Sequence, residues 1–210
     1  MTLNEKIQQE ADLSDWMPEI KYSVFAQPDN EFYYSHEAGF IRKYKVFRAI
    51  SKILQPESIT ELGTCAGASA DAYLDGVGWK AFYNGYDAWW PAAPYYVDGV
   101  EQDWDRYSIC KSLFKDRKFK GYKLFKKDLR TLRKVEKADL AIVDAMHDYR
   151  NCYHDLNLAL TAEPKHILVD DTAGIEVIQA VEDWVYLNAC KVKSMDKIEQ
   201  INGACIITLK

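Results

Sequence analysis

The amino-acid sequence predicts a doubly wound α/β domain with a mostly parallel sheet. From residue 58 onward, short apolar runs alternate with segments of helical periodicity, a pattern typical of parallel strands joined by right-handed helical crossovers. The runs at 141–143 and 167–169 are entirely apolar, as expected for strands buried on both faces of a sheet. The 210 residues are enough for one substantial core, so a single α/β domain is expected.

The expected elements follow one another along the chain. Residues 1–35 form an N-terminal extension with a short helix, and residues 36–210 form the domain. The domain begins with an amphipathic helix at 36–54, because apolar residues recur there at helical spacing until Pro56 ends the pattern. Further helices are expected at 66–74, 104–114, 150–162 and 174–188. Strands are expected at 58–62, 81–86, 122–125, 138–143, 166–169, 189–195 and 204–209, the last two as an antiparallel hairpin that completes a seven-stranded sheet.

Composition argues against several classes of protein. A net charge of -5 and a pI of about 5.4 disfavour a nucleic-acid partner, which requires a basic surface. The five cysteines are scattered and odd in number, which fits neither a disulfide framework nor a zinc site and suits a reducing cytoplasm. The sequence contains no secretory signal and no apolar run of roughly 20 residues. We therefore expect a cytoplasmic protein with no membrane partner.

The first candidate ligand site is the glycine-containing loop after the first strand. In a doubly wound sheet, ligands bind at the carboxyl ends of the strands, where the strand order switches. This loop contains Glu61, Gly63, Thr64, Gly67 and Ser69. Its glycines permit a tight turn and a close approach of the backbone, and the helix that follows presents free N–H groups. The G-x-x-x-G spacing differs from the dinucleotide motif G-x-G-x-x-G, and the preceding acid suits a cationic amino-acid head better than a phosphate. A purely structural turn is the alternative.

The second candidate is Asp87, at the end of the second strand. A carboxylate in this position can accept hydrogen bonds from both hydroxyls of a ribose. The alternative for Asp87 is a cap of a helix or a turn.

The third candidate is an acidic cluster with a histidine beside it. Asp144 follows one apolar strand, and Asp170 and Asp171 follow the next, so the carboxylates are expected to converge. Like charges this close repel unless a cation lies between them, and oxygen ligands suit Mg²⁺ or Mn²⁺. His147 could take a proton from a substrate hydroxyl, because its ordinary pKa of about 6.5 lies near working pH. The alternatives are that Asp170 and Asp171 cap the next helix and that His147 only packs or caps.

Together these segments resemble a known family. Residues 61–69, 85–87, 143–149 and 169–171 resemble class I S-adenosylmethionine (SAM)-dependent methyltransferases. Within that class they are most similar to the metal-dependent small-molecule O-methyltransferases of the macrocin O-methyltransferase and cephalosporin-hydroxylase-like group. The resemblance runs from about residue 38 to 210 and implies a Rossmann-like fold, SAM as cofactor, and Mg²⁺ or Mn²⁺.

The resemblance also implies a role for each candidate residue. Asp87 would bind the ribose of SAM, and Asp128 would lie near its adenine. His147 and Asp144 would be the catalytic residues, with His147 as the base. The cofactor loop, with the methionine part of SAM, would comprise Glu61, Gly63, Thr64, Gly67 and Ser69, and Asp144 would adjoin the cofactor. The metal ligands would be Asp144, Asp170 and Asp171.

The sequence departs from the family pattern in two places. Ala145 and Met146 stand where the family usually has a glycine after the first metal ligand, which narrows the loop. The stretch 89–96 is unusually aromatic; it is either a lid that stacks on a ring or sugar face or an oligomer contact in a homodimer. The resemblance implies that Trp89 and Tyr149 line the pocket.

The expected function is transfer of a methyl group from SAM to a hydroxyl of a small molecule such as a sugar, a diol or a natural product. A metal would chelate two neighbouring substrate oxygens, and His147 would remove the proton. The alternatives are a metal-independent SAM methyltransferase and a non-catalytic binding protein on the same fold. The glycine spacing disfavours a nicotinamide dehydrogenase.

Overall fold

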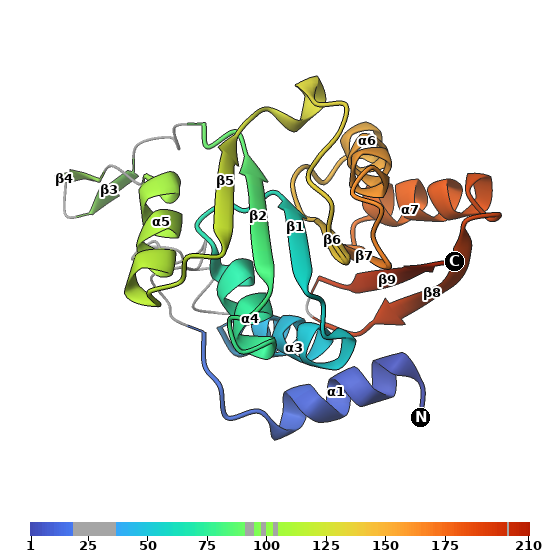
Figure 1. The fold of residues 1–210 in the computed structure, drawn as a ribbon, viewed down its shortest axis with the longest axis horizontal. Helices are drawn as coiled ribbons and strands as arrows, with labels where there is room; N and C mark the ends of the chain where they lie inside the picture. Colours follow the sequence, from blue (N-terminus) through green and yellow to red (C-terminus); the bar gives the residue numbers. More distant parts are fainter. Residues whose placement is uncertain (19–36, 91–94, 98–99, 103–104, 201) are drawn as a thin grey trace.

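The central element of the fold is a seven-stranded sheet with the order β5-β2-β1-β6-β7-β9-β8 (Figure 1). The computed structural model describes residues 1–18, 37–90, 95–97, 100–102, 105–200 and 202–210. The strands are β1 Ser58–Leu62, β2 Phe82–Asp87, β5 Tyr122–Lys126, β6 Leu140–Val143, β7 His166–Asp170, β8 Val192–Ile198 and β9 Ala204–Leu209. The first five are parallel, whereas β9 is antiparallel to both β7 and β8. The predicted doubly wound sheet with its C-terminal hairpin is confirmed.

Helices cover both faces of this sheet. They are α1 Leu3–Leu13, α3 Glu37–Leu54, α4 Ala68–Gly76, α5 Arg106–Asp116, α6 Tyr149–Leu160 and α7 Ile175–Leu187. Side chains of a strand point alternately to the two faces. Leu140 and Ile142 of β6 accordingly join the core beside α3, α4 and α5, whereas Ala141 and Val143 join the core beside α6 and α7. Burial on both faces explains why this strand is apolar throughout.

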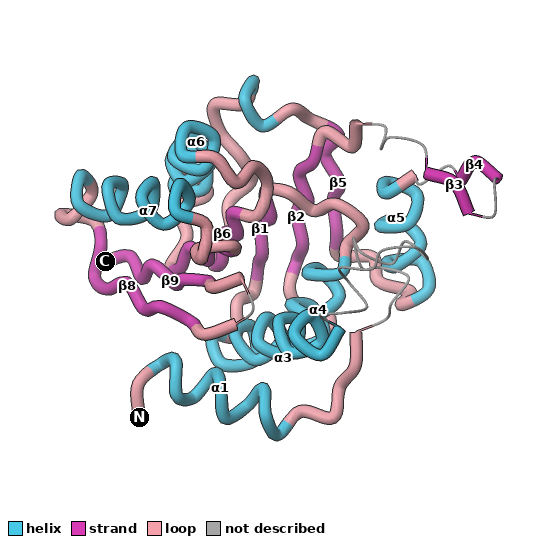
Figure 2. Tube along the Cα trace, turned by 180° about the vertical axis from the view of Figure 1, so that it is seen from behind, coloured by secondary structure: helices cyan, strands magenta, loops and turns pink. Residues whose placement is uncertain are grey.

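The first helix belongs to the same core as the domain. Thr2 and Glu5 form a capping box at its start, and Ile7 and Ala11, one turn apart, are buried in the core beside α3. Figure 2 shows α1 running alongside α3. The predicted boundary between extension and domain, at residues 35 and 36, lies outside the described residues.

The predicted elements begin and end within three residues of their observed boundaries, and three of the shifts have a clear local reason. Helix α4 begins at Ala68 because Gly67, in a left-handed conformation, is its N-cap. Helix α5 begins after its N-cap Asp105, and the expected start at 104 lies outside the described residues. Strand β8 begins at Val192 because the N–H group of that residue still donates to the carbonyl of Asn188, the C-cap of α7.

A small hairpin lies within and just after the aromatic stretch. Strands β3 Tyr95–Val97 and β4 Val100–Gln102 pair antiparallel as a separate two-stranded sheet. The sequence did not predict this pair. Residues 91–94 of the aromatic stretch lie outside the described residues.

The topology places a crevice between β1 and β6. The chain leaves β1 toward β2 and β5 and then returns across β1 to form β6 and β7. The carboxyl ends of β1 and β6 are therefore the switch point at which ligands bind in such sheets.

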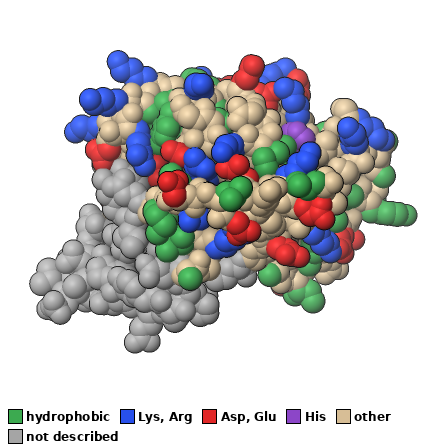
Figure 3. Space-filling view, turned by 90° about the horizontal axis from the view of Figure 1, so that it is seen from below, with side chains coloured by type: hydrophobic (Ala, Val, Ile, Leu, Met, Phe, Trp, Pro, Cys, Tyr) green, Lys and Arg blue, Asp and Glu red, His purple; other side chains and the backbone are tan. Residues whose placement is uncertain are grey.

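The surface carries side chains of both charges. On the face shown in Figure 3, acidic and basic side chains are interspersed over the described part. Among the described residues, no helix is both long and apolar enough to cross a bilayer.

Candidate active site

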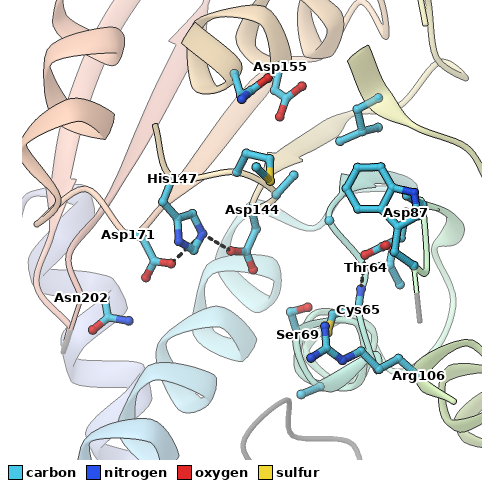
Figure 4. Close-up of a pocket in the computed structure, with 18 of the residues that line it drawn as sticks. Thr64, Cys65, Ser69, Asp87, Arg106, Asp144, His147, Asp155, Asp171 and Asn202 are labelled. Carbon is cyan, nitrogen blue, oxygen red and sulfur yellow. Dashed lines mark hydrogen bonds and ion pairs between the residues drawn. The ribbon is translucent and has the colours of Figure 1, made fainter. Parts of the chain in front are cut away.

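A cavity of about 510 Å³ opens at the switch point, within the range of small-molecule sites. Its walls come from the loop after β1, the end of β2, the segment after β5, the loops after β6 and β7, and residues of α3, α5 and α6, Lys43 of α3 among them (Figure 4). The predicted site residues that line it are Gly63, Thr64, Ser69, Asp87, Asp128, Asp144, His147 and Asp171. Three others, Glu61, Gly67 and Asp170, are not part of its lining.

The glycine loop is shaped by two residues with positive φ. Gly63 has φ +102°, and a Cβ atom there would overlap the backbone carbonyl of Asp144. Gly67 has φ +91° and caps α4 without a side chain. Both conformations favour glycine. The contact at Gly63 joins the predicted cofactor loop directly to the loop that carries Asp144.

Glu61 lies behind the glycine loop instead of facing the cavity. Its side chain is fully buried in β1 and accepts a hydrogen bond from the Tyr83 hydroxyl. Burial raises the pKa of Glu61 to about 8, against the opposing effect of hydrogen bonds from Tyr83 and Ser69. The side chain of Glu61 is therefore buried behind the loop, and its carboxyl group is largely protonated at neutral pH.

Asp87 faces the cavity and also fixes the loops around it. Its Oδ2 accepts a hydrogen bond from the backbone N–H of Cys65 at 2.9 Å, and its Oδ1 accepts one from Trp89 at 2.6 Å. The Trp89 indole donates to the Cys65 carbonyl at 2.7 Å, so the Trp89 side chain is buried and holds this loop in place. Trp90, not Trp89, lines the cavity. Each carboxylate oxygen retains a lone pair for a ligand.

Asp128 lines the cavity from the segment that follows β5. It is the N-cap of the 3₁₀ turn Leu129–Thr131 and forms an ion pair with Arg130 at 2.7 Å. A second carboxyl, Asp155 of α6, also lines the cavity but was missed in the sequence. It is 2% exposed, and burial raises its pKa to about 7. Its place on the buried stripe of α6 was the available signal.

His147 bridges two carboxylates at the cavity wall. Its Nε2 lies 3.0 Å from Asp171 Oδ2 and 3.8 Å from Asp144 Oδ1, and Figure 4 shows the ring between the two aspartates. One ligand atom from each of these residues lies within 4.8 Å of the others. Hydrogen bonds to Asp144 and Asp171 raise the pKa of His147 to about 10. In this arrangement the imidazole is a cation at neutral pH.

Asp170 points away from the cavity. Its Oδ1 accepts a hydrogen bond from Gln200 Nε2 at 2.7 Å, and its Oδ2 lies 2.5 Å from Lys43 Nζ. The same ammonium lies 3.3 Å from Asp171 Oδ1. The structure brings Asp144, His147 and Asp171 together at the cavity, whereas Asp170 is held in the interior by Lys43.

Lys43 is the important site residue that the sequence did not reveal. It lies on α3 three residues after Phe40 and four before Phe47, on the buried stripe of that helix, and is 7% exposed. Although burial opposes it, the charges of Asp170, Asp144 and Asp171 raise the pKa of Lys43, so it stays an ammonium. A lysine on an otherwise apolar stripe was the signal. Tyr149, expected in the pocket, instead donates to Asp183 and does not line the cavity.

Comparisons with known proteins identify the fold. No family model and no curated protein matches the chain. A methyltransferase of Podospora anserina, PaMTH1, solved with bound SAH, is 16% identical with a TM-score of 0.63, covering 98% of this chain and 94% of its own. The O-methyltransferase TomG of Streptomyces achromogenes, solved with SAM and involved in tomaymycin synthesis, is 14% identical with a TM-score of 0.61, covering 100% of both chains. An O-methyltransferase of Bacillus cereus with SAH is 15% identical with a TM-score of 0.62, covering 97% of this chain and 96% of its own. The chain thus has the fold of the class I SAM-dependent methyltransferases.

Proposed function

We propose that this protein is a SAM-dependent methyltransferase that methylates a hydroxyl oxygen of a small molecule. The observation that carries the proposal is a single cavity at the switch point, lined by Asp87 with the glycine loop and by Asp144, His147 and Asp171. The first group suits a nucleoside, and the second can accept and stabilise a proton. The SAM or SAH bound in the three similar methyltransferases supports the choice of cofactor.

Some of the cavity residues would hold the nucleoside part of SAM, and others would attract its positively charged sulfonium. Asp87 would accept hydrogen bonds from the ribose hydroxyls with the lone pairs that Cys65 and Trp89 leave free. Asp144, whose backbone meets Gly63, would place a carboxylate near the methionine end. A sulfonium ion is attracted to such a carboxylate. Asp128 and Asp155 would lie toward the adenine.

The reaction is a direct displacement at the methyl carbon. The acceptor oxygen attacks that carbon, the bond from carbon to sulfur breaks, and the electron pair stays on sulfur, which leaves a neutral thioether. The hydroxyl proton passes to the small fraction of His147 that is neutral at pH 7, and Asp144 and Asp171 stabilise the imidazolium that results. Because the methyl donor is already activated, positioning supplies much of the rate.

The metal implied by the family resemblance was Mg²⁺ or Mn²⁺ on Asp144, Asp170 and Asp171. These residues do not fit such an ion as a set, because both oxygens of Asp170 are engaged by Gln200 and Lys43. Asp144, His147 and Asp171 offer three ligand atoms close enough to bind one metal ion. A metal-assisted variant of the methyl transfer that uses these three ligands is therefore the second candidate function. In that variant His147 would be a ligand, and another group would accept the proton.

A transfer assay tests the proposed function. Wild-type protein is incubated with SAM labelled in its methyl group and with separate pools of sugars, catechol-like diols and other small hydroxyl compounds. Label is expected in at least one pool and is expected to fall sharply with His147→Gln. Tight SAM binding without transfer to any pool would favour the non-catalytic binding protein.

A further inference from the structure

We propose that Lys43 is a built-in cation that takes the place of a divalent metal in the acidic cluster, so that the protein works without a bound metal ion. The inference rests on the proposed methyl transfer and concerns how the same site balances its charge. Lys43 does not touch the reacting atoms in this reading; it is a positioning residue that acts through Asp170 and Asp171.

The position of the ammonium is what excludes a metal. Lys43 Nζ lies 2.5 Å from Asp170 Oδ2 and 3.3 Å from Asp171 Oδ1. Mg²⁺ binds carboxylate oxygens at about 2.0–2.1 Å, so an ion shared by these two carboxylates would have to occupy the space of the ammonium. The metal site predicted from the sequence and the ion pair in the structure are mutually exclusive.

The surroundings of Lys43 show that its position is fixed. Its side chain is 9% exposed and that of Asp170 is completely buried. The ammonium also lies 5.5 Å from the centre of the Phe47 ring, one helical turn further along α3. Gln200 holds the other oxygen of Asp170. Withdrawal of Lys43 would leave a buried carboxylate without its counter-ion, which is strongly unfavourable.

The groups around the cluster come from four separate segments of the chain. Lys43 comes from α3, Asp144 and His147 from the loop after β6, and Asp170 and Asp171 from the end of β7. Two polar residues, Gln200 and Asn202, come from the turn before β9. Lys43 thereby orders Asp171, and Asp171 in turn holds His147 at 3.0 Å.

Binding of Mn²⁺, followed by electron paramagnetic resonance, tests the proposal without any methyl acceptor. Chelator-treated wild-type protein is expected to leave the signal of free Mn²⁺ unchanged. Lys43→Met is expected to bind Mn²⁺ and so to lower the signal of free Mn²⁺, because removal of a nearby positive charge favours a cation. Lys43→Arg keeps the charge and is expected to behave as wild type. The matched control is Lys45→Met, since Lys45 lies on the same helix but donates to the Ser14 carbonyl at 2.8 Å.

Two results would overturn the proposal. The first is Mn²⁺ binding by wild-type protein that Asp171→Asn abolishes. The second is a folded Lys43→Met variant that binds Mn²⁺ no better than wild type. If Lys43→Met does not fold, Lys43→Gln removes the charge but keeps a hydrogen-bond donor for Asp170, and it is expected to gain Mn²⁺ binding instead. Failure of wild type to bind SAM would refute the proposed function, but the Mn²⁺ experiment would still test the role of Lys43, because it uses neither SAM nor a methyl acceptor.

Discussion

Replacement of Asp87 by alanine should weaken SAM binding and also reduce stability. The carboxylate faces the cavity, and it also accepts hydrogen bonds from the backbone N–H groups of Cys65 and Trp89 at 2.9 and 2.6 Å. The substitution therefore removes contacts to the ligand together with two contacts that order the surrounding loops. An affinity measurement alone would not separate these effects.

The expected magnitudes follow from these contacts. A hydrogen bond to a charged group contributes about 1.5–3 kcal/mol, so the loss of two ribose contacts should cost about 3 kcal/mol or more. That corresponds to SAM binding weakened by roughly a hundredfold. The two backbone N–H groups lie beside the cavity, where water can replace the carboxylate, so the free energy of unfolding should fall by about 2 kcal/mol.

The assay pairs calorimetric titration with SAM and denaturant unfolding, with Asp139→Ala as the control. Asp139 accepts hydrogen bonds from the backbone N–H groups of Glu57 and Ser58 at 3.0 and 3.2 Å. Asp139 directly precedes β6 and so lies at the amino ends of the parallel strands, whereas the cavity lies at their carboxyl ends. The control should lose stability and keep its SAM affinity. Wild-type affinity in Asp87→Ala, or an equal loss of affinity in Asp139→Ala, would refute the assignment of Asp87 to the ribose.

Three further predictions concern other parts of the site. If His147 must lose its proton to act, the rate should rise with pH toward an apparent pKa of about 10, and a rate that levels off near pH 7 would contradict this role. Burial raises the pKa of Glu61 to about 8 in the folded state from 4.5, so the folded protein retains this proton longer and stability should fall as pH rises from about 4.5 to 8. Glu61→Gln should remove that fall, and an unchanged pH dependence of the unfolding free energy would count against it. Gly63→Ala should cost about 3 kcal/mol or more of stability and weaken SAM binding, because its Cβ would overlap the Asp144 carbonyl. The control Gly78→Ala also has positive φ but meets no atom closer than 3.9 Å, so it should cost only about 1 kcal/mol; equal losses in the two variants would show that the contact does not matter.

The fold was predictable from the sequence because its strands and helices carry strong periodic patterns. The apolar runs of β6 and β7 and the polar residues directly after them located the carboxyl edge of the sheet. Asp87 and Asp144 line the cavity. Boundaries shifted by up to three residues, in one case because Gly67, with its positive φ, delays the start of α4.

The direction of individual side chains accounts for most of what the sequence did not predict. Neighbouring residues of a strand face opposite sides, so Asp170 shares the side of Leu168, which packs toward α3. Asp171, with φ +55°, turns into the cavity instead. Glu61 likewise shares the side of Ile59 and is buried. Lys43 lies far from the strand ends in sequence, and only the packing of α3 brings it to Asp170.

The central claim, that the cavity is a SAM site, is tested most directly by calorimetric titration of chelator-treated wild-type protein with SAM. Saturable binding of one SAM per chain, strongly weakened in Asp87→Ala, is the predicted result. No detectable binding by folded protein, or binding that Asp87→Ala leaves unchanged, would contradict it.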